Sequence, residues 1–209
     1  MKTKLCLLIL LIVGLSVQLS ANPINGLLER IDKGASKKFV IEFKKGADDF
    51  FELDQKGTKV VVRGNNYVNI ATGINWYLKY YAGIQLSWNG MQTKLPQVLP
   101  PVPRKERHET SLSLRYDFNY CTYSYTMAFW DWERWEKEID WMALHGINLP
   151  LAAVGQECIW FNMLQKLGYS KDEINRFIAG PAFLAWWAMN NLEGWGGPNP
   201  DSWYVQQEA

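Results

Sequence analysis

The chain has 209 residues, with 22 Lys and Arg against 21 Asp and Glu, and this balance already excludes several classes of protein. A net charge of +1 argues against a nucleic-acid partner held by a basic patch, and against an acidic disordered tail. Counts of 16 Gly and 9 Pro exclude collagen-like and low-complexity chains. Aromatic residues stand out at 14%, and most of the 11 Trp lie after residue 129. The length allows one or two small domains.

Residues 1–21 have the pattern of a secretory signal peptide. Lys2 and Lys4 precede an unbroken apolar run at 5–13, and small residues at 20–21 offer a cleavage site. The apolar run is shorter than the roughly 20 residues that a membrane helix needs. We therefore expect export to the periplasm or the extracellular space and no stable membrane span.

Export changes the interpretation of the cysteines that remain after cleavage, Cys121 and Cys158. In an oxidising compartment they form one disulfide or stay as two partly buried thiols, and the residues alone leave both possibilities open. His108 and His145 do not have metal-ligand spacing. The sequence contains no zinc motif, phosphate loop or GxSxG elbow, so we predict neither a metal nor another cofactor.

Residues 22–94 are predicted to form a small α/β domain. Runs of β-branched residues favour strands, and an apolar stripe at helical spacing favours a helix that ends near Gly83. None of these segments carries recognisable catalytic chemistry. The expected elements are helices at 24–32 and 65–81, strands at 37–44 and 58–63, a shorter strand at 49–54, and a return of 84–88 to the sheet.

Residues 95–110 contain four prolines followed by a charged cluster (LPQVLPPVPRKERHET). Proline favours extended backbone, which is typical of a linker or of a strap between domains. We expect a domain boundary here, and we expect the charged cluster to be a solvated turn rather than a binding site.

Residues 111–153 are predicted to form a βαβ unit with parallel strands and a right-handed crossover. The strand at 111–118 is followed by a helix that Asp131 caps and that runs to Leu144. The apolar run at 147–153 is typical of a strand buried on both faces. Four apolar residues at helical spacing predict the core face of the helix, Trp141 is also expected in the core, and one ion pair is expected on the solvated side. The face comprises Trp132, Trp135, Ile139 and Met142, and the pair is Glu133–Lys137.

A long helical excursion follows the second strand. A helix at 156–167 is closed by Gly168, a capping box of Ser170 and Glu173 opens the next, and a third starts at Pro181. The next crossover helix begins only near residue 202, whereas typical βα loops have about two to six residues. Such excursions at the carboxyl ends of parallel strands are where (β/α)₈ enzymes build active sites, and these barrels need about 250 residues. We therefore expect 111–209 to be the first, incomplete part of a (β/α)₈ barrel.

Polar and aromatic residues at these strand ends suit a sugar ligand. Amide and carboxylate groups bind hydroxyls, and Trp rings stack on the apolar face of a pyranose. The candidates are Asn119, Gln156 and Glu157 with Trp160, Trp186 and Trp195. Other interpretations stay open, because Glu157 is equally favourable at a helix N-terminus, Asp117 can cap a loop, and Trp rings often belong to a core. The residues show no carboxylate pair at the roughly 5–5.5 Å of a retaining glycosidase.

Two segments, NYCTYSYTMAFWDWERWEKEIDWMALHGINLPLAAVGQECIW and GPAFLAWWAMNNLEGWGGPNPDSW, closely resemble the α-N-acetylglucosaminidase family, glycoside hydrolase family 89. The resemblance spans residues 111–209, and 22–100 resemble the small N-terminal domain of that family. It implies an N-terminal α/β domain, a (β/α)₈ catalytic barrel and a helical C-terminal domain. It also implies metal-free, retaining hydrolysis of terminal α-linked N-acetylglucosamine by two glutamates that lie on later strands, beyond residue 209.

The resemblance further implies which residues contact the sugar. Asn119 and Cys121 match the N-x-C motif that lines the sugar subsite, which argues against a disulfide at Cys121. Trp186 matches the pocket-wall tryptophan of the GPAFLAW motif. Gln156 and Glu157 match the GQE motif at the pocket rim or in its supporting shell, and Glu157 matches neither catalytic glutamate.

Three functions follow, in order of preference. The first is an exported exo-acting glycosidase for glycans with terminal α-linked N-acetylglucosamine, of which this chain is an N-terminal part that is inactive alone. The alternative is a non-catalytic secreted carbohydrate-binding module. A third is another exported glycosidase, such as a β-hexosaminidase or an α-glucuronidase, and the order of the motifs argues against it.

Overall fold

A computed structural model describes residues 22–88, 90–91 and 94–204. The chain divides into two compact units between Glu109 and Thr110, and each is described by itself. The signal peptide predicted for 1–21 lies outside the described residues. Within the described ranges, no helix combines the length and apolar character that a membrane crossing requires.

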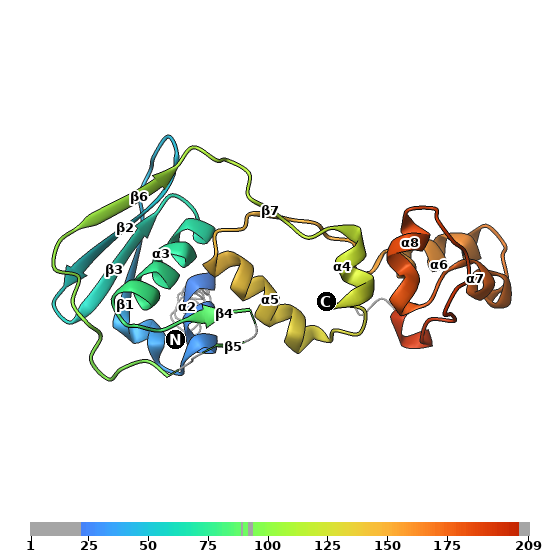
Figure 1. The fold of residues 1–209 in the computed structure, drawn as a ribbon, viewed down its shortest axis with the longest axis horizontal. Coiled ribbons are helices and arrows are strands. Elements are labelled where there is room, and N and C mark those ends of the chain that lie inside the picture. Colours follow the sequence, from blue (N-terminus) through green and yellow to red (C-terminus); the bar gives the residue numbers. More distant parts are fainter. Residues whose placement is uncertain (1–21, 89, 92–93, 205–209) are drawn as a thin grey trace, which may run out of the picture. The chain divides into compact units, whose positions relative to one another are not determined.

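The first unit is built on a four-stranded sheet with the order β1-β3-β2-β6 (Figure 1). Parallel pairing joins β1 to β3, with Phe39 opposite Val60. Antiparallel pairing joins β2 to β3 around a tight turn at Gly57, where a positive φ of 61° favours glycine. The strands are β1 (Phe39–Phe43), β2 (Asp49–Lys56), β3 (Lys59–Gly64) and β6 (Glu106–Thr110).

Two helices, α2 (Pro23–Ile31) and α3 (Tyr67–Tyr80), and a 3₁₀ turn η1 (Ala35–Lys38) complete this unit. Helix α3 packs on β2 and β3, and a Cβ on Gly73 would lie 2.9 Å from the Val62 side chain, so glycine permits the close approach. The predicted helices are confirmed, but the C-cap of α3 is Tyr81 rather than the predicted Gly83, which follows two residues later with φ 66°. The fully buried core includes Leu28, Leu53, Ile70, Ile74, Tyr77 and Leu78.

The proline-rich segment is a strap that packs on the first unit. Leu95, Leu99 and Val102 are buried, and the Tyr77 hydroxyl donates to the Pro100 carbonyl at 2.6 Å. The charged residues after it form strand β6, so the prediction of a solvated turn is wrong. His108 explains why, because its ring stacks inward on a Phe ring of β2 and on a Trp ring of α3.

The sequence suggested that the segment 84–88 returns to the main sheet, but in the structure it does not. Strand β4 (Leu86–Ser87) pairs with β5 (Gly90–Met91) in a separate two-stranded ribbon. The Ser87 hydroxyl donates to the Gly90 carbonyl at 2.6 Å and stabilises this tight reversal.

Glu52 on β2 is a charged residue within the first unit's core, with 2% of its surface exposed. Burial favours the neutral acid, but hydrogen bonds from Lys44, Lys105 and Arg107 outweigh burial and lower its pKa to about 2. The nitrogen–oxygen distances are 2.6, 2.9 and 3.2 Å. Glu52 therefore joins the strap and β6 to the sheet as a carboxylate.

The second unit begins with a βαβ unit, as predicted. Strand β7 (Tyr116–Asp117) pairs in parallel with β8 (Leu149–Pro150), and helix α5 (Trp132–Leu144) lies between them in sequence. Both strands are shorter than expected, and Leu149 is 43% exposed rather than buried on both faces. In the described part of the chain these strands pair only with each other, so the ladder has two open edges.

Helix α5 starts at the predicted cap, because the Asp131 side chain accepts a hydrogen bond from the Arg134 amide. The predicted core face is confirmed only in part, since Met142 is buried but Trp132 is 69% exposed and Ile139 is 47% exposed. The helix instead buries Glu138, whose carboxylate pairs with Arg134 at 2.9 Å. The ion pair predicted on the solvated side, between Lys137 and Glu133, is confirmed at 2.7 Å.

The remaining helices form a small core of their own. The predicted capping box of Ser170 is present, and Gly168, with φ 96°, follows the end of the preceding helix as expected. The elements are α4 (Tyr120–Tyr125), α6 (Gln156–Lys166), α7 (Lys171–Phe177), η2 (Pro181–Phe183), α8 (Leu184–Ala188) and η3 (Asp201–Tyr204). Their shared core comprises Phe161, Ile174, Ile178, Ala179, Trp187 and Tyr204.

Candidate functional site

The carboxyl ends of β7 and β8 lie on one edge of their sheet. The parallel register places Tyr116 opposite Leu149 and Asp117 opposite Pro150, and both strands lead into helices (Figure 1). The expectation of parallel strands in this βαβ unit is confirmed. Segments that follow the two strands are therefore available to build one site at this edge.

The turn after β7 has an uncommon backbone. Phe118 has φ 75°, a left-handed conformation that costs about 1–3 kcal/mol for a residue other than glycine. Its amide donates to the Asp117 carboxylate at 2.8 Å, and Asn119 caps α4 by accepting from the Thr122 amide at 3.2 Å. The Tyr123 hydroxyl donates to the Leu151 carbonyl, which ties α4 to the segment after β8. The strained turn thus fixes α4 beside the strand ends.

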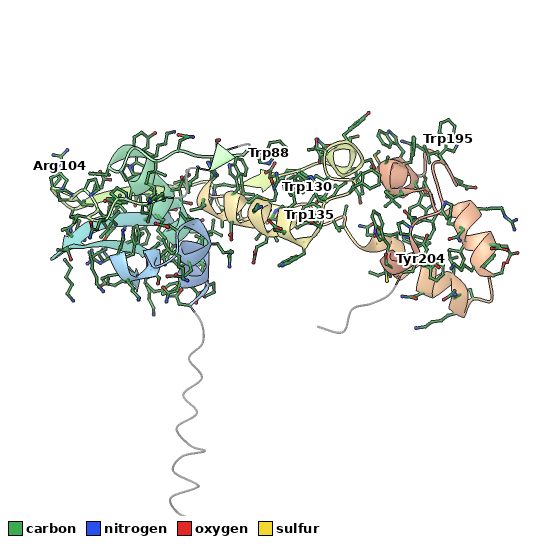
Figure 2. All side chains as sticks on the ribbon, turned by 90° about the horizontal axis from the view of Figure 1, so that it is seen from below. Trp88, Arg104, Trp130, Trp135, Trp195 and Tyr204 are labelled. Atoms are coloured by element: carbon green, nitrogen blue, oxygen red, sulfur yellow. The ribbon has the colours of Figure 1, made fainter. Side chains whose placement is uncertain are left out.

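A cavity of about 220 Å³ lies among α4, the start of α5, the start of α6 and α8. Its walls are mainly apolar and include six aromatic residues, among which Trp130 packs edge-on against Trp135 at 5.0 Å between ring centroids (Figure 2). Two polar side chains, Gln156 and Glu157, enter it from the N-terminal turn of α6. An apolar cavity with a few polar groups is the usual form of a small-molecule site. Its lining includes Tyr123, Trp130, Trp135, Gln156, Glu157, Trp187 and Trp203.

Glu157 is a buried titratable group at this cavity. Only 8% of its surface is exposed, and burial raises its pKa above the ordinary glutamate value. Hydrogen bonds from the backbone of Glu157 and Gly155 oppose this shift without cancelling it. Among the described residues no cation forms an ion pair with Glu157. A carboxyl with a raised pKa can donate a hydrogen bond when neutral and accept one when ionised.

The structure brings together two of the five residues predicted to bind substrate. Gln156 and Glu157 line the cavity. The exposed Asn119 uses its carbonyl oxygen to cap α4, while the half-buried Cys121 is not among the lining residues. Trp186 lies outside the cavity and packs edge-on against a tyrosine of α4 at 5.2 Å, whereas its neighbour lines the cavity. The roles of all five in substrate binding stay predictions.

Most of the lining residues were not singled out from the sequence as ligands. Tyr123, Trp130 and Trp187 supply much of the aromatic wall. For Trp130 a sequence signal existed, because it directly precedes the helix cap Asp131; in the structure it lies under the Arg134 guanidinium at 3.8 Å. Trp187 gave no such signal, since it is adjacent in sequence to the tryptophan that the family motif indicated.

Both cysteines within the described ranges, Cys121 and Cys158, are unpaired. Cys158 is buried, donates to the Tyr204 carbonyl at 3.4 Å and accepts from the Asn162 amide at 3.4 Å. Cys121 is half-buried and free. In the ranges that the structure describes, no group of three or more His, Cys, Asp or Glu residues is placed to hold a metal ion.

Two family models match the chain in order. Residues 22–101 match the alpha-N-acetylglucosaminidase (NAGLU) N-terminal domain, and residues 115–209 match the alpha-N-acetylglucosaminidase (NAGLU) tim-barrel domain. A human relative, alpha-N-acetylglucosaminidase, is 45% identical over 176 residues, which cover 84% of this chain and 24% of the relative. The chain thus spans about a quarter of the length of that relative.

Solved structures of a family 89 glycoside hydrolase from Clostridium perfringens have the same fold. The complex with PUGNAc matches with a TM-score of 0.83 at 40% identity, covering 88% of this chain and 21% of that one. A form with two glutamates replaced by glutamine, in complex with its substrate GlcNAc-α-1,4-galactose, matches with a TM-score of 0.82 at the same identity and coverage. These matches confirm the predicted fold class, an N-terminal α/β domain followed by a partial TIM-barrel domain.

Proposed function

Because the chain belongs to the alpha-N-acetylglucosaminidase family, we propose that it is the N-terminal part of an exo-acting glycoside hydrolase. The substrate is a glycan with terminal α-linked N-acetylglucosamine, and the disaccharide GlcNAc-α-1,4-galactose represents its simplest form. The observation that supports this proposal most directly is the aromatic cavity at the carboxyl ends of β7 and β8, with Gln156 and Glu157 at its polar side.

The chemistry of the cavity fits the amino sugar. Aromatic rings such as those of Trp130 and Trp187 bind the C–H face of a pyranose, and the Gln156 amide can donate to and accept from ring hydroxyls. Glu157 adds a buried carboxyl whose pKa burial raises, and this group accepts hydrogen bonds from hydroxyl or N–H groups when ionised and can donate one when protonated. In our proposal this chain contributes binding groups to the pocket.

The proposed reaction is a double displacement with retention of configuration. Such a mechanism needs a nucleophilic carboxylate and an acid/base carboxyl about 5–5.5 Å apart. Glu157 is the one carboxylate among the lining residues of this cavity, so it has no carboxylate partner there. We therefore assign both catalytic glutamates to sequence outside these 209 residues, and we expect this chain alone to be inactive.

A hybrid enzyme tests the proposal. Residues 22–204 would replace the corresponding segment of the Clostridium perfringens enzyme, and hydrolysis of nitrophenyl α-N-acetylglucosaminide would be measured for the hybrid and for the 209-residue chain. We expect turnover by the hybrid and none by the chain alone. Turnover by the chain alone would overturn the assignment of the catalytic pair. A folded hybrid that binds PUGNAc but does not hydrolyse the substrate would overturn the proposed activity.

Single substitutions in the hybrid then test the substrate contacts. We expect Gln156→Ala and Trp186→Ala each to lower kcat/KM by at least tenfold, which corresponds to about 1.4 kcal/mol. Ile159→Ala is a matched control, because this exposed residue of α6 is not among the lining residues. An unchanged kcat/KM for Trp186→Ala would assign that ring to packing.

A carbohydrate-binding module is the second candidate, and the single carboxylate of the cavity favours it. It predicts that the 209-residue chain binds N-acetylglucosamine, while the hybrid is folded but inactive. Calorimetric titration of the chain and the hybrid with the sugar measures this binding. The hydrolysis assay then separates the two candidates, since only the enzyme turns the glycoside over.

We also propose that the protein is exported and that residues 1–21 are removed. The basic start, the short apolar run and the small residues before Asn22 support this. N-terminal sequencing of the protein from the periplasm or the culture medium is expected to begin at Asn22. An N-terminus at Met1 on protein recovered from membranes would overturn it.

A further inference from the structure

Helix α5 buries a carboxylate that no step of the proposed reaction uses. Glu138 is 1% exposed, and a buried carboxylate is costly unless a cation or hydrogen-bond donors pair with it. The Arg134 guanidinium meets this need, because one of its nitrogens lies 2.9 Å from a carboxylate oxygen of Glu138 one turn further along the helix. The cost of this buried pair calls for a role beyond that of a surface ion pair.

The same guanidinium lies over the ring of Trp130, with 3.8 Å between its central carbon and the ring centroid. This distance is that of a cation–π contact, and a planar guanidinium also stacks on an aromatic face. Arg134 therefore connects a buried carboxylate to an aromatic ring. Lysine would supply the charge at this position but not the planar group that contacts both partners.

Trp130 belongs to the wall of the cavity, whereas Arg134 and Glu138 are not among the lining residues. The guanidinium thus supports the ring from outside the cavity. Trp135 supports it on another side, edge-on at 5.0 Å between ring centroids. A ring that is fixed before the ligand arrives binds at a lower entropy cost than a mobile one.

All parts of this support come from one short segment of the chain. The Trp130 amide donates to the Met127 carbonyl at 3.1 Å. Asp131 follows directly and caps α5 by accepting from the Arg134 amide at 2.9 Å. These hydrogen bonds fix the ring and the guanidinium relative to each other within the segment itself.

We propose that Arg134, held by Glu138, is a positioning residue that fixes the Trp130 ring as a sugar-binding wall. This inference rests on the proposed function and adds to it a residue that does not line the cavity. An ordered ring binds the apolar face of the pyranose equally well before and during the reaction, so the pair lowers KM and leaves kcat unchanged. A matched ion pair on the solvated side of the same helix joins Lys137 to Glu133 at 2.7 Å.

Kinetics of the hybrid enzyme that carries residues 22–204 test this role. We expect Arg134→Ala and Glu138→Gln each to raise KM for nitrophenyl α-N-acetylglucosaminide by about fivefold or more, while kcat stays within about twofold of the wild type. Arg134→Lys should raise KM nearly as much, because it keeps the charge and loses the planar contact. Lys137→Ala is the matched control, and it should leave both constants unchanged.

A double-mutant cycle identifies the ring through which Arg134 acts. If that ring is Trp130, the KM of the double variant Trp130→Ala/Arg134→Ala should equal the KM of Trp130→Ala alone. A second measurement uses the 209-residue chain itself. The Nε–H proton of Arg134 should be shifted upfield by the indole ring in the NMR spectrum, and Trp130→Ala should remove this shift.

The outcomes separate this inference from the proposed function. If Arg134→Ala leaves KM unchanged, or lowers kcat at constant KM as a partly unfolded enzyme would, the activity stands and the positioning role is overturned. Additive effects in the cycle, or an Arg134 proton without the upfield shift, also overturn that role. A wild-type hybrid that is folded but inactive overturns the proposed activity instead, and its affinity for PUGNAc then replaces KM in the same cycle.

Discussion

The two units enclose their strands to very different degrees. In the first unit four strands and two helices share one core, and Leu53 of β2 is fully buried. In the second unit two strands of two residues each pair with one another, and Leu149 of β8 is 43% exposed. Its main burial occurs instead among the helices α6, α7 and α8. The first unit therefore buries its sheet with its own residues, whereas the second unit supplies only the sheet edge at which a site can form.

The largest expected effect contrasts these two strand leucines. Leu53→Ala should lower the free energy of unfolding of the first unit by about 2–5 kcal/mol, because it removes a buried side chain and leaves a cavity. Leu149→Ala should change stability by less than about 0.5 kcal/mol. Hydrogen exchange in increasing urea, measured separately for peptides of each unit, provides both values. Equal effects would show that β8 is as enclosed as β2 and would remove the contrast.

The next effect concerns Glu52, whose folded pKa of about 2 lies below the ordinary value of 4.5. A lowered pKa means that the carboxylate contributes fully above pH 4.5 and that this contribution is lost as the pH falls toward 2. We expect Glu52→Gln to cost the first unit about 3 kcal/mol at pH 7 and almost nothing near pH 2. Urea unfolding of wild type and variant across this range measures the difference. A constant difference would show that packing, not charge, explains the loss.

Local sequence signals were sufficient for most helix boundaries. Side-chain caps at Asp131 and Ser170 and the glycine at Gly83 place helix ends, the last to within two residues, through hydrogen bonds or backbone angles that a few residues determine. Strand β6 and the face of α5 could not be predicted in this way. Strand β6 depends on partners distant in sequence, such as the aromatic ring that receives His108. On α5 the apolar pattern did not reveal that Glu138 is buried beside its i,i+4 partner Arg134.

The candidate site was predictable to a similar extent. Gln156 and Glu157 were placed correctly at the edge of the sheet, because they follow a parallel strand and open a helix. The sequence did not reveal which residues of the five-residue helix α8 face the cavity. This orientation determines that Trp187 rather than Trp186 lines it. Adjacent helical residues point about 100° apart, so a shift of one residue exchanges a pocket wall for a surface ring.

A smaller effect tests whether the helical part of the second unit opens locally. Ser170→Ala removes the capping box of α7 and should cost about 1 kcal/mol. Asn66→Ala removes the cap of α3 in the first unit, with a similar expected cost. We expect Ser170→Ala to speed hydrogen exchange in α7 alone, whereas Asn66→Ala should affect the whole first unit, because α3 packs on its central strands. A uniform response of the second unit to Ser170→Ala would contradict this.

The smallest effect sharpens the contrast between two of the buried glutamates, Glu52 and Glu157. Burial raises the pKa of Glu157, so its ionised form is disfavoured in the folded state, and stability is lost as the pH rises through the ordinary value of 4.5. Glu157→Gln should therefore match the wild type near pH 4 and be slightly more stable at pH 7, the opposite of Glu52→Gln. Thermal unfolding at both pH values measures this difference. Lower stability of the variant at pH 7 would mean that a cation or a donor outside the described residues holds the carboxylate. A gain at pH 7 would instead indicate that Glu157 is kept at the cavity for ligand binding at the expense of stability, because a packing role alone would favour the neutral amide.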